Sequence, residues 1–430
     1  MKRVAITTLG CKTNQFESAA MGEQLVKAGY SVVPFCEPAD IYVVNSCTVT
    51  ARTDAETRRI VRRAHRLNPQ ARIVATGCYA QVAPGDLERM PEVDIVLGNR
   101  EKNDIAALLE SEQSLVSDIT AERTGGTLKL KTFAEHTRAF LQAQNGCNSF
   151  CSYCIVPFAR GRSRSVPIED MLAGVRDLAA NNYKEVVLTG IHLGAYGMDL
   201  TPEHSLTELV RQIDAERPVP RLRIGSVEPN ELSDELIALM ARSTIICPHL
   251  HLPLQSGSDS VLARMGRRYT ASFFQDLLTR VSALLPDAFI GIDVIAGFPG
   301  ETEEEFSETL QLVEAMPLSD LHVFPYSRRT GTKAAEMPDQ VADQVIKARA
   351  KQLRNVAALK KNTFLNRFVG RELQILVQGH DTATGLCRGL SRNYIDMKFV
   401  GDNSLVNSEV RVKVLRADNE TMYGEMTTGR

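Results

Sequence analysis

Three closely spaced cysteines offer the clearest chemistry in this sequence. Cys147, Cys151 and Cys154 form a C-x3-C-x2-C pattern, and thiolates so close together in one loop can converge on a metal centre, most often an iron–sulfur cluster. Structural zinc is the alternative, but it usually takes four ligands in two C-x2-C pairs, and no second pair follows. Three ligands on a four-iron cluster leave one iron open. We therefore expect an iron–sulfur centre that can bind a substrate.

A second set of three cysteines is spread more widely along the chain. Cys11, Cys47 and Cys78 each come shortly after an apolar, β-rich run. In a parallel sheet all three would lie at the carboxyl edge, where ligands usually bind, so we expect a second cluster, again one ligand short. Three unrelated buried cysteines are the alternative, since free Cys often behaves as a small hydrophobe. That reading suits the remaining cysteines, which have no comparable setting: Cys36, Cys247 and Cys387.

The elements around the second set predict a doubly wound parallel sheet in residues 1–115, because strands alternate with amphipathic helices. The expected strands are 3–8, 41–44, 73–76 and 93–97, and the expected helices are 17–28 and 55–67. Residues 116–135 are polar, contain Gly125-Gly126 and suit a linker.

Residues 136–362 predict a partial (β/α)6 barrel, in which chemistry gathers at the C-terminal ends of the strands. The expected strands are 139–144, 185–188, 221–225, 249–254, 289–296 and 321–326; the helices are 168–181, 205–216, 230–241, 271–285, 303–315 and a long 339–361. Five short strands within 363–430 then predict a small all-β barrel.

Length and composition agree with a globular α/β protein of several domains. The 430 residues suit about three domains of ~150 residues, and 43% hydrophobic with 24% charged residues excludes a disordered chain or a fibre. No apolar run approaches the ~20 residues of a membrane span, and the run after Lys2-Arg3 is shorter than the ~7–15 residues of a signal peptide core. We expect a cytoplasmic protein without a membrane partner, whose cysteines bind metal rather than form disulfides.

Several segments resemble one known family, the radical S-adenosylmethionine methylthiotransferases. Residues 144–161, Q-N-G-C-N-S-F-C-S-Y-C-I-V-P-F-A-R-G, are similar to its cofactor loop, and residues 8–15, T-L-G-C-K-T-N-Q, with the contexts of Cys47 and Cys78, are similar to its N-terminal domain. L-P-L-Q-S-G-S at 252–258 and G-F-P-G-E at 297–301 resemble its later barrel loops. The last ~65 residues resemble its RNA-binding TRAM barrel, so the resemblance spans the whole chain.

The resemblance implies two [4Fe-4S] clusters and S-adenosylmethionine. The cluster of the C-x3-C-x2-C loop would bind S-adenosylmethionine at its open iron, and reductive cleavage would yield a 5′-deoxyadenosyl radical that removes a hydrogen atom from the target. The cluster of the second set would carry a sulfur, methylated by a second S-adenosylmethionine, and deliver a methylthio group. A reductant such as flavodoxin or ferredoxin and a sulfur donor are the implied partners.

The family also suggests cofactor contacts beyond the cysteines. Tyr153 would pack beside the adenine, although ordinary core packing is the alternative, and Thr189-Gly190 ends a strand where such enzymes hold the methionine amino group. Asp293, inside an apolar strand, is expected to be a paired buried carboxylate. Residues at other strand ends could touch the ribose or adenine: Ser226, Gln255 and Ile295.

The family has three kinds of target: isopentenyladenosine in tRNA, threonylcarbamoyladenosine in tRNA, and an aspartate of a ribosomal protein. The stretches L-T-G-I-H-L-G-A-Y-G at 188–197 and H-L-H-L-P-L-Q at 249–255 look most like the threonylcarbamoyladenosine enzymes. This resemblance implies methylthio transfer to C2 of that nucleoside, next to the anticodon. The spacing and charge of the residues select no nucleoside.

Local charge favours RNA over protein as the target, although the net charge is −2. Residues 344–371 are basic with no acidic residue, and residues 58–66 form a second basic helix, both suited to phosphate contacts; a solvated face is the alternative for either. The terminal barrel is nearly neutral, so RNA there would need stacking, through Tyr394 and Phe399. We expect contacts to a tRNA anticodon stem-loop at Arg349, Lys351, Arg354, Lys360 and Lys361.

A non-catalytic iron–sulfur protein that binds RNA or transfers electrons is the rival of another class. Its clusters would be fully ligated, and it would not cleave S-adenosylmethionine. Two sites with three cysteines each argue against it.

Overall fold

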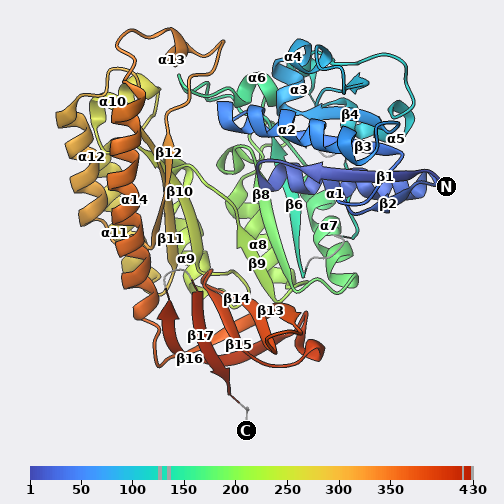
Figure 1. Ribbon diagram of the computed structural model, residues 1–430. Coiled ribbons are helices and arrows are strands. Elements are labelled where there is room, and N and C mark those ends of the chain that lie inside the picture. The colour runs from blue at the N-terminus through green and yellow to red at the C-terminus, as the bar shows by residue number, and fades with distance from the viewer. Residues whose placement is uncertain (124–127, 133–136, 419–420, 428–430) are drawn as a thin grey trace.

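The N-terminal part of the chain is a parallel sheet with helices on both faces (Figure 1). The computed structural model describes residues 1–123, 128–132, 137–418 and 421–427, so Gly125-Gly126 of the expected linker lies outside the described residues. The strand order is β2-β1-β3-β4-β5. The strands are β1 (Arg3–Thr8), β2 (Ser31–Val33), β3 (Ile41–Ser46), β4 (Arg72–Gly77) and β5 (Ile95–Val96), and the helices are α1 (Lys12–Lys27), α2 (Ala51–Leu67), α3 (Cys78–Val82), α4 (Pro84–Glu88) and α5 (Ile105–Leu108).

The register of this sheet aligns the ends of three strands. Thr8 pairs with Asn45, and Ser46 pairs with Gly77, so β1, β3 and β4 end at the same level. The polypeptide leaves each of these ends with a cysteine one to three residues later. The expectation of a shared carboxyl edge is therefore confirmed.

The central part forms an open half-barrel of parallel strands. One sheet has the order β7-β6-β8-β9 and the next has β10-β11-β12, and single bridges between Leu222 and Ile246 and between Ser226 and His251 join them. Among the described strands of this part, the short β7 alone runs antiparallel, to β6. The strands are β6 (Arg138–Asn145), β7 (Arg164–Ser165), β8 (Glu185–Gly190), β9 (Arg221–Ile224), β10 (His249–Gln255), β11 (Phe289–Ala296) and β12 (Asp320–Pro325).

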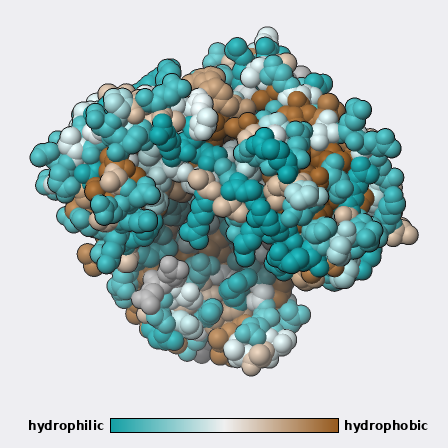
Figure 2. Space-filling view, turned by 45° about the horizontal axis from the view of Figure 1, so that its top comes forward, coloured by the Kyte–Doolittle hydropathy of each residue, from teal (hydrophilic) through white to brown (hydrophobic). Residues whose placement is uncertain are grey.

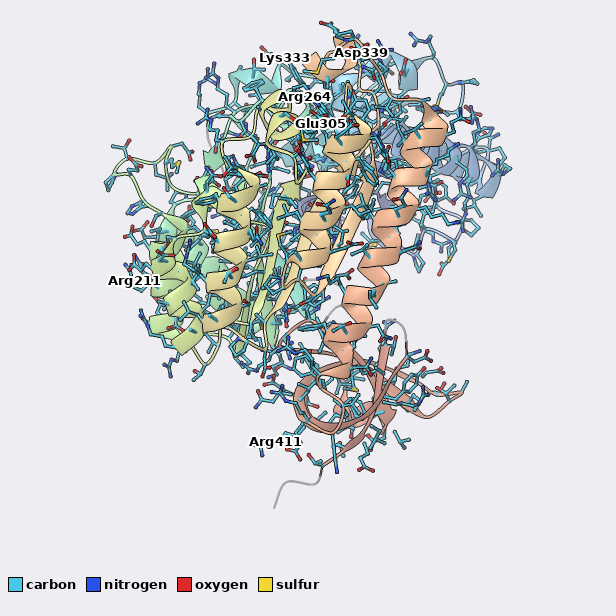
Figure 3. All side chains as sticks on the ribbon, turned by 90° about the vertical axis from the view of Figure 1, so that its left-hand side faces the viewer. Arg211, Arg264, Glu305, Lys333, Asp339 and Arg411 are labelled. Carbon is cyan, nitrogen blue, oxygen red and sulfur yellow. The ribbon has the colours of Figure 1, made fainter. Side chains whose placement is uncertain are left out.

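Amphipathic helices cover the outside of this half-barrel, and their apolar faces form its largest core. Arg264 and Glu305 tie two of them together through a pair 2.6 Å apart (Figure 3). The helices are α6 (Val156–Arg160), α7 (Ile168–Ala180), α8 (Leu206–Glu216), α9 (Asp234–Arg242), α10 (Asp259–Met265), α11 (Ala271–Leu284), α12 (Glu303–Ala315), α13 (Lys333–Glu336) and α14 (Asp343–Asn366). Among the described residues, no helix combines the length and apolarity that crossing a membrane requires.

The long helix α14 connects the half-barrel to the C-terminal barrel (Figures 1 and 3). It extends beyond the expected end at residue 361 because Phe364 and Leu365 are buried in the core of the terminal barrel. That barrel is closed, in the order β13-β14-β15-β17-β16. Its strands are β13 (Glu372–Asp381), β14 (Leu386–Ser391), β15 (Asp396–Val400), β16 (Glu409–Asp418) and β17 (Thr421–Met426).

A buried ionic network fixes the terminal barrel under the half-barrel. Glu185 accepts hydrogen bonds from Arg221 and Arg223, and Arg221 Nη2 also donates to the carbonyls of Leu390 and Ser391 at 3.1 and 2.9 Å. Burial opposes ionisation of Glu185, but the two arginines outweigh it and hold its pKa well below the usual range. The surface turned to the viewer in Figure 2 is mostly hydrophilic and is hollowed above the lobe formed by this barrel.

Candidate active site

The loop between β6 and α6 brings Cys147, Cys151 and Cys154 together. Gly146 has φ +74°, and a Cβ there would lie 1.8 Å from the carbonyl oxygen of Arg162, so only glycine fits this entry to the loop. Backbone hydrogen bonds then fix the loop, including Cys147 N to Gly161 O at 3.0 Å and Cys154 N to Cys151 O at 2.9 Å. The three thiols are thus held in place by the surrounding backbone.

Cations flank these thiols. Arg267 Nη1 lies 3.4 Å from Cys151 Sγ, and His192 Nδ1 lies 3.5 Å from Cys147 Sγ. Burial, together with the charges of Cys151 and Cys147, raises the pKa of Cys154 to about 12. A set of three thiols beside two cations fits a negatively charged iron–sulfur cluster.

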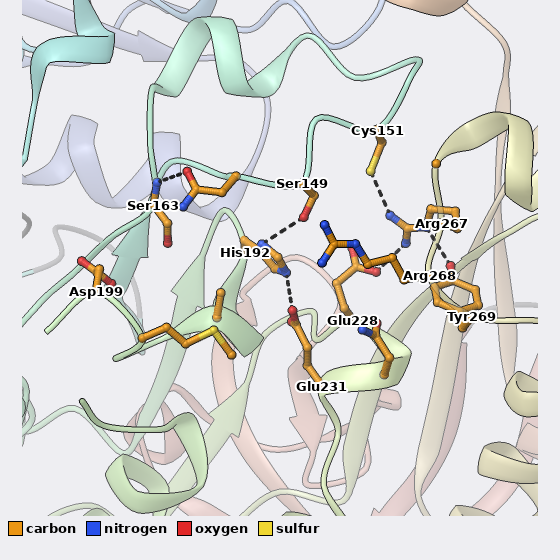
Figure 4. A pocket seen from close by; sticks show the side chains of 15 residues that line it. Ser149, Cys151, Ser163, His192, Asp199, Glu228, Glu231, Arg267, Arg268 and Tyr269 are labelled. Atoms are coloured by element: carbon orange, nitrogen blue, oxygen red, sulfur yellow. Dashed lines mark hydrogen bonds and ion pairs between the residues drawn. The ribbon is translucent and has the colours of Figure 1, made fainter.

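A cavity of about 500 Å³ opens beside the loop (Figure 4). His192 Nε2 lies 2.8 Å from Glu231, and Arg267 pairs with Glu228 at 2.5 Å. Burial opposes the charge on His192, but Cys147 and Glu231 outweigh it and raise its pKa to about 10. Carboxylates and cations thus face one another beside the thiols, a set of groups suited to the charged amino acid end of S-adenosylmethionine.

The second set of cysteines meets at the carboxyl edge of the N-terminal sheet. Cys11 precedes α1, Cys47 follows β3 and Cys78 begins α3. Two glycines allow the close approach, because a Cβ on Gly10 would lie 2.8 Å from Cys47 Cβ and one on Gly77 would lie 2.4 Å from the Ser46 carbonyl. Burial raises the pKa of Cys47 to about 11, and the charges of Cys78 and Cys11 contribute. The set therefore also fits an iron–sulfur cluster.

An arginine from the other cysteine loop reaches this second set. Arg160 Nε donates to Cys78 Sγ at 3.1 Å, and its other nitrogens bind the side chains of Glu17 and Asn14. Lys102 completes this group of charged side chains, with Nζ 2.6 Å from Glu17 Oε2. Arg160, Glu17 and Lys102 are all buried, so a net positive charge adjoins Cys78.

A second cavity, of about 180 Å³, is lined by sequence neighbours of one cysteine from each set. Val49 and Thr50, just after Cys47, form part of its wall, and Tyr153, next to Cys154, forms another part. Residues next to a cysteine of each set therefore line one cavity at the strand ends of the half-barrel. This is where a group could meet chemistry from both centres.

The cofactor contacts expected from the sequence fall in different places. Tyr153, Gln255 and Ile295 line the 180 Å³ cavity. Thr189 and Gly190 end β8. Ser226, the last of the expected contacts, has its Oγ 2.6 Å from Nδ1 of His251 in β10.

The basic face expected on α14 is only partly free. Arg349 is buried at 5% exposure and pairs with Glu301 and Glu303. The expectation of an RNA contact there is wrong, because these two carboxylates already neutralise its charge. Lys360 donates to the carbonyls of Glu314 and Met316.

The other three α14 residues differ in exposure. Lys361 pairs with Asp320 at 2.7 Å, whereas Lys351 and Arg354 are exposed. Stacking of RNA on Phe399 is also excluded, because its side chain is buried in the terminal barrel, and Tyr394 packs against His249.

Sequence reasoning missed the charged partners of the cysteines. His192 and Arg267 lie 45 and 116 residues from the cysteines they contact, and Glu17 lies 143 residues from Arg160. Only Arg160, six residues after Cys154 at the end of the short helix α6, carried a local signal.

Comparison with known proteins places these features in one family. Residues 3–98 match the family described as "Uncharacterized protein family UPF0004", and residues 141–313 match the radical SAM superfamily. Threonylcarbamoyladenosine tRNA methylthiotransferase MtaB of Bacillus subtilis (strain 168) is 40% identical over 427 residues, 97% of this chain and 94% of that protein. The chain belongs to the radical SAM methylthiotransferases. The resemblance predicted from its motifs is confirmed.

Other methylthiotransferases are similar at lower identity. The tRNA-2-methylthio-N(6)-dimethylallyladenosine synthase of Desulfitobacterium hafniense (strain Y51) is 33% identical, covering 100% of this chain and 98% of that protein. Among solved structures, the radical S-adenosylmethionine methyltransferase TsrM of Kitasatospora setae matches with TM-score 0.56 at 16% identity, covering 78% of this chain and 77% of that one. This structural match supports the fold. The family uses [4Fe-4S] clusters and S-adenosylmethionine, as the sequence predicted.

Proposed function

We propose that this protein adds a methylthio group to C2 of N6-threonylcarbamoyladenosine, next to the anticodon of tRNA. The observation that carries the proposal is the cavity lined by neighbours of both cysteine sets, together with the 40% identical relative named for this reaction. The proposal excludes a non-catalytic role, because an RNA-binding or electron-transfer protein has no need of two three-cysteine sites whose neighbouring residues line one cavity.

The six cysteines are the proposed ligands of two clusters, Cys147, Cys151 and Cys154 of one and Cys11, Cys47 and Cys78 of the other. When bound, the clusters and S-adenosylmethionine would supply the electron, the radical and the methylated sulfur that the reaction needs.

The chain's own groups hold these centres in place. Arg267 and His192 balance negative charge at the first set of cysteines, and Arg160 does so at Cys78. Tyr153, Gln255 and Ile295 would shape the wall against which the adenosine portion of the cofactor or the target base lies.

We further propose that four consecutive parts of the chain have different roles. Residues 1–115 would hold the sulfur-carrying cluster, 116–135 would act as linker, 136–362 would form the radical core and 363–430 would be a TRAM-like RNA-binding barrel. Lys351 and Arg354, exposed on α14, are the proposed phosphate contacts. A one-electron donor of the flavodoxin or ferredoxin class and a sulfur donor would act with it, in the cytoplasm where tRNA is modified.

The proposal is tested by mass spectrometry of nucleosides from total tRNA of cells with and without the gene. Loss of the 2-methylthio derivative of threonylcarbamoyladenosine, with accumulation of its precursor, is the expected result. An unchanged tRNA profile would reject the nucleoside, and a digest of ribosomal proteins would then show whether the same chemistry acts on an aspartate.

A further inference from the structure

Four polar side chains form a continuous chain across neighbouring strands of the half-barrel. Ser226 Oγ lies 2.6 Å from His251 Nδ1, and His251 Nε2 lies 2.9 Å from Asp293 Oδ1. Asp293 Oδ1 in turn lies 3.4 Å from His322 Nδ1. The sequence predicted a paired buried carboxylate at Asp293, but it predicted neither histidine partner.

This polar chain continues the wall of the 180 Å³ cavity. Asp293 itself lines that cavity, as do Gln255, Ile295 and Phe324. Side chains two residues apart on a strand point to the same side, so His322 shares the face of Phe324. The histidines therefore extend the cavity wall away from the cysteines, toward the amino ends of the strands.

The His322 end of this row of polar side chains is open for binding. The His322 side chain is 52% exposed, whereas those of His251 and Asp293 are each 18% exposed. In the described part of the chain, Nε2 of His322 has no hydrogen-bonding partner. Asp293 raises the pKa of His322, which favours a charged ring that donates from Nε2.

This arrangement suits a polar substituent and not a hydrocarbon one. A threonylcarbamoyl group carries a carboxylate, a hydroxyl and a urea, all of which accept hydrogen bonds, whereas a dimethylallyl group has no polar atom. Sites built to hydrogen-bond a ligand strongly reject analogues that lack the polar group, because the site's own polar atoms are left unpaired.

We propose that His322, oriented by Asp293 and His251, binds the threonylcarbamoyl group of the target nucleoside and thereby selects it over dimethylallyladenosine. The inference rests on the proposed function, since it names the residue that reads the substituent. His322 is the proposed binding residue, and Asp293 and His251 are positioning residues that orient its ring.

The test measures RNA binding by fluorescence anisotropy, with the full chain carrying both reconstituted clusters and S-adenosylmethionine. Three anticodon stem-loops are compared, bearing threonylcarbamoyladenosine, dimethylallyladenosine or unmodified adenosine. His322→Phe is expected to lose ~10- to 100-fold in affinity for the first RNA and to change little for the other two. His322→Gln, which keeps a donor, is expected to lose less.

His204→Phe is the matched control, because His204 also pairs with a carboxylate, Glu208 at 2.9 Å, but that carboxylate does not line the cavity, whereas Asp293, the partner of His322, does. Iron content and thermal unfolding report whether each variant is folded and loaded. An equal loss of affinity for all three RNAs, or an unchanged preference in His322→Phe, would overturn the role of His322 but leave the proposed function standing. A wild-type protein that does not prefer the threonylcarbamoyl RNA would overturn the proposed nucleoside as well.

The three groups of His251, Asp293 and His322 lie within 4.8 Å of one another and could also hold a metal ion. Elemental analysis for zinc and manganese on the same samples separates the two readings. One such metal per chain, lost in His322→Gln, would overturn direct reading of the substituent by His322.

Discussion

Arg160 donates its Nε–H to the sulfur of Cys78 across 3.1 Å, although the two residues belong to different cysteine sites. Arg160 ends α6, directly after the loop of Cys147, Cys151 and Cys154, whereas Cys78 begins a helix of the N-terminal sheet. Any movement of one site relative to the other would break this contact. This buried side chain therefore helps to hold the two centres in place relative to each other.

Substitution of Arg160 tests this connection. Arg160→Met leaves Glu17 buried with Lys102 alone, and breaking a buried pair typically costs ~3–5 kcal/mol. Urea unfolding of the cluster-free protein should show a loss of that size. Arg162→Met, an exposed arginine two residues away, should stay within ~0.5 kcal/mol; equal losses in the two variants would contradict a special role for Arg160.

Glu17 predicts how stability depends on pH. Burial opposes its ionisation, but Arg160 and Lys102 outweigh it and lower its pKa from 4.5 to about 2. A folded-state pKa below the unfolded one means that the stabilisation is present above about pH 4.5 and is lost as the pH falls toward 2. Glu17→Gln should therefore be less stable at neutral pH and show a shallower loss in acid. Parallel unfolding curves against pH for wild type and variant would refute this.

The two cysteine sets should fail in different ways. Cys154→Ala should abolish formation of 5′-deoxyadenosine, whereas Cys78→Ala should retain it and stop methylthio transfer. Each variant should retain about 4 irons of about 8 after reconstitution. Chromatography of 5′-deoxyadenosine and of the nucleoside products distinguishes the two. If Cys78→Ala still forms methylthio product, its set does not carry the sulfur.

Exposed charge on α14 should contribute to RNA affinity through phosphates. Replacing Lys351 and Arg354 by alanine should reduce the slope of log affinity against log salt by ~0.7–0.9 per lost phosphate contact. Lys27→Ala, an exposed lysine at the end of α1, is the control and should leave the slope unchanged. A double variant with the wild-type slope would move the RNA interface elsewhere.

The periodic pattern of apolar residues predicted those parts of the site that depend on short segments of the sequence. Strand periodicity placed Cys11, Cys47 and Cys78 at one sheet edge, because the ends of parallel strands share an edge whatever the details of packing. The same reasoning found the six parallel strands of the half-barrel. It missed β7, whose two residues are too short for a periodic signal.

Tertiary contacts determined what the sequence could not predict. The charge on Arg349 suggested an RNA contact, but which side of a helix is buried depends on its neighbours, and here Glu301 lies against it. The pairing of His322 with Asp293 likewise depends on the register of β11 with β12. Such long-range pairs carry no spacing signal in a single sequence.

The most direct test of the central claim is a competition between two substrates. The reconstituted protein, with S-adenosylmethionine, a reductant and sulfide, is given equal amounts of anticodon stem-loops that bear threonylcarbamoyladenosine or dimethylallyladenosine, and the nucleosides are analysed by mass spectrometry. The expected result is a methylthio group on the threonylcarbamoyl nucleoside, with little on the other. Methylthiolation of the dimethylallyl nucleoside alone, or of neither RNA despite cleavage of S-adenosylmethionine, would contradict it.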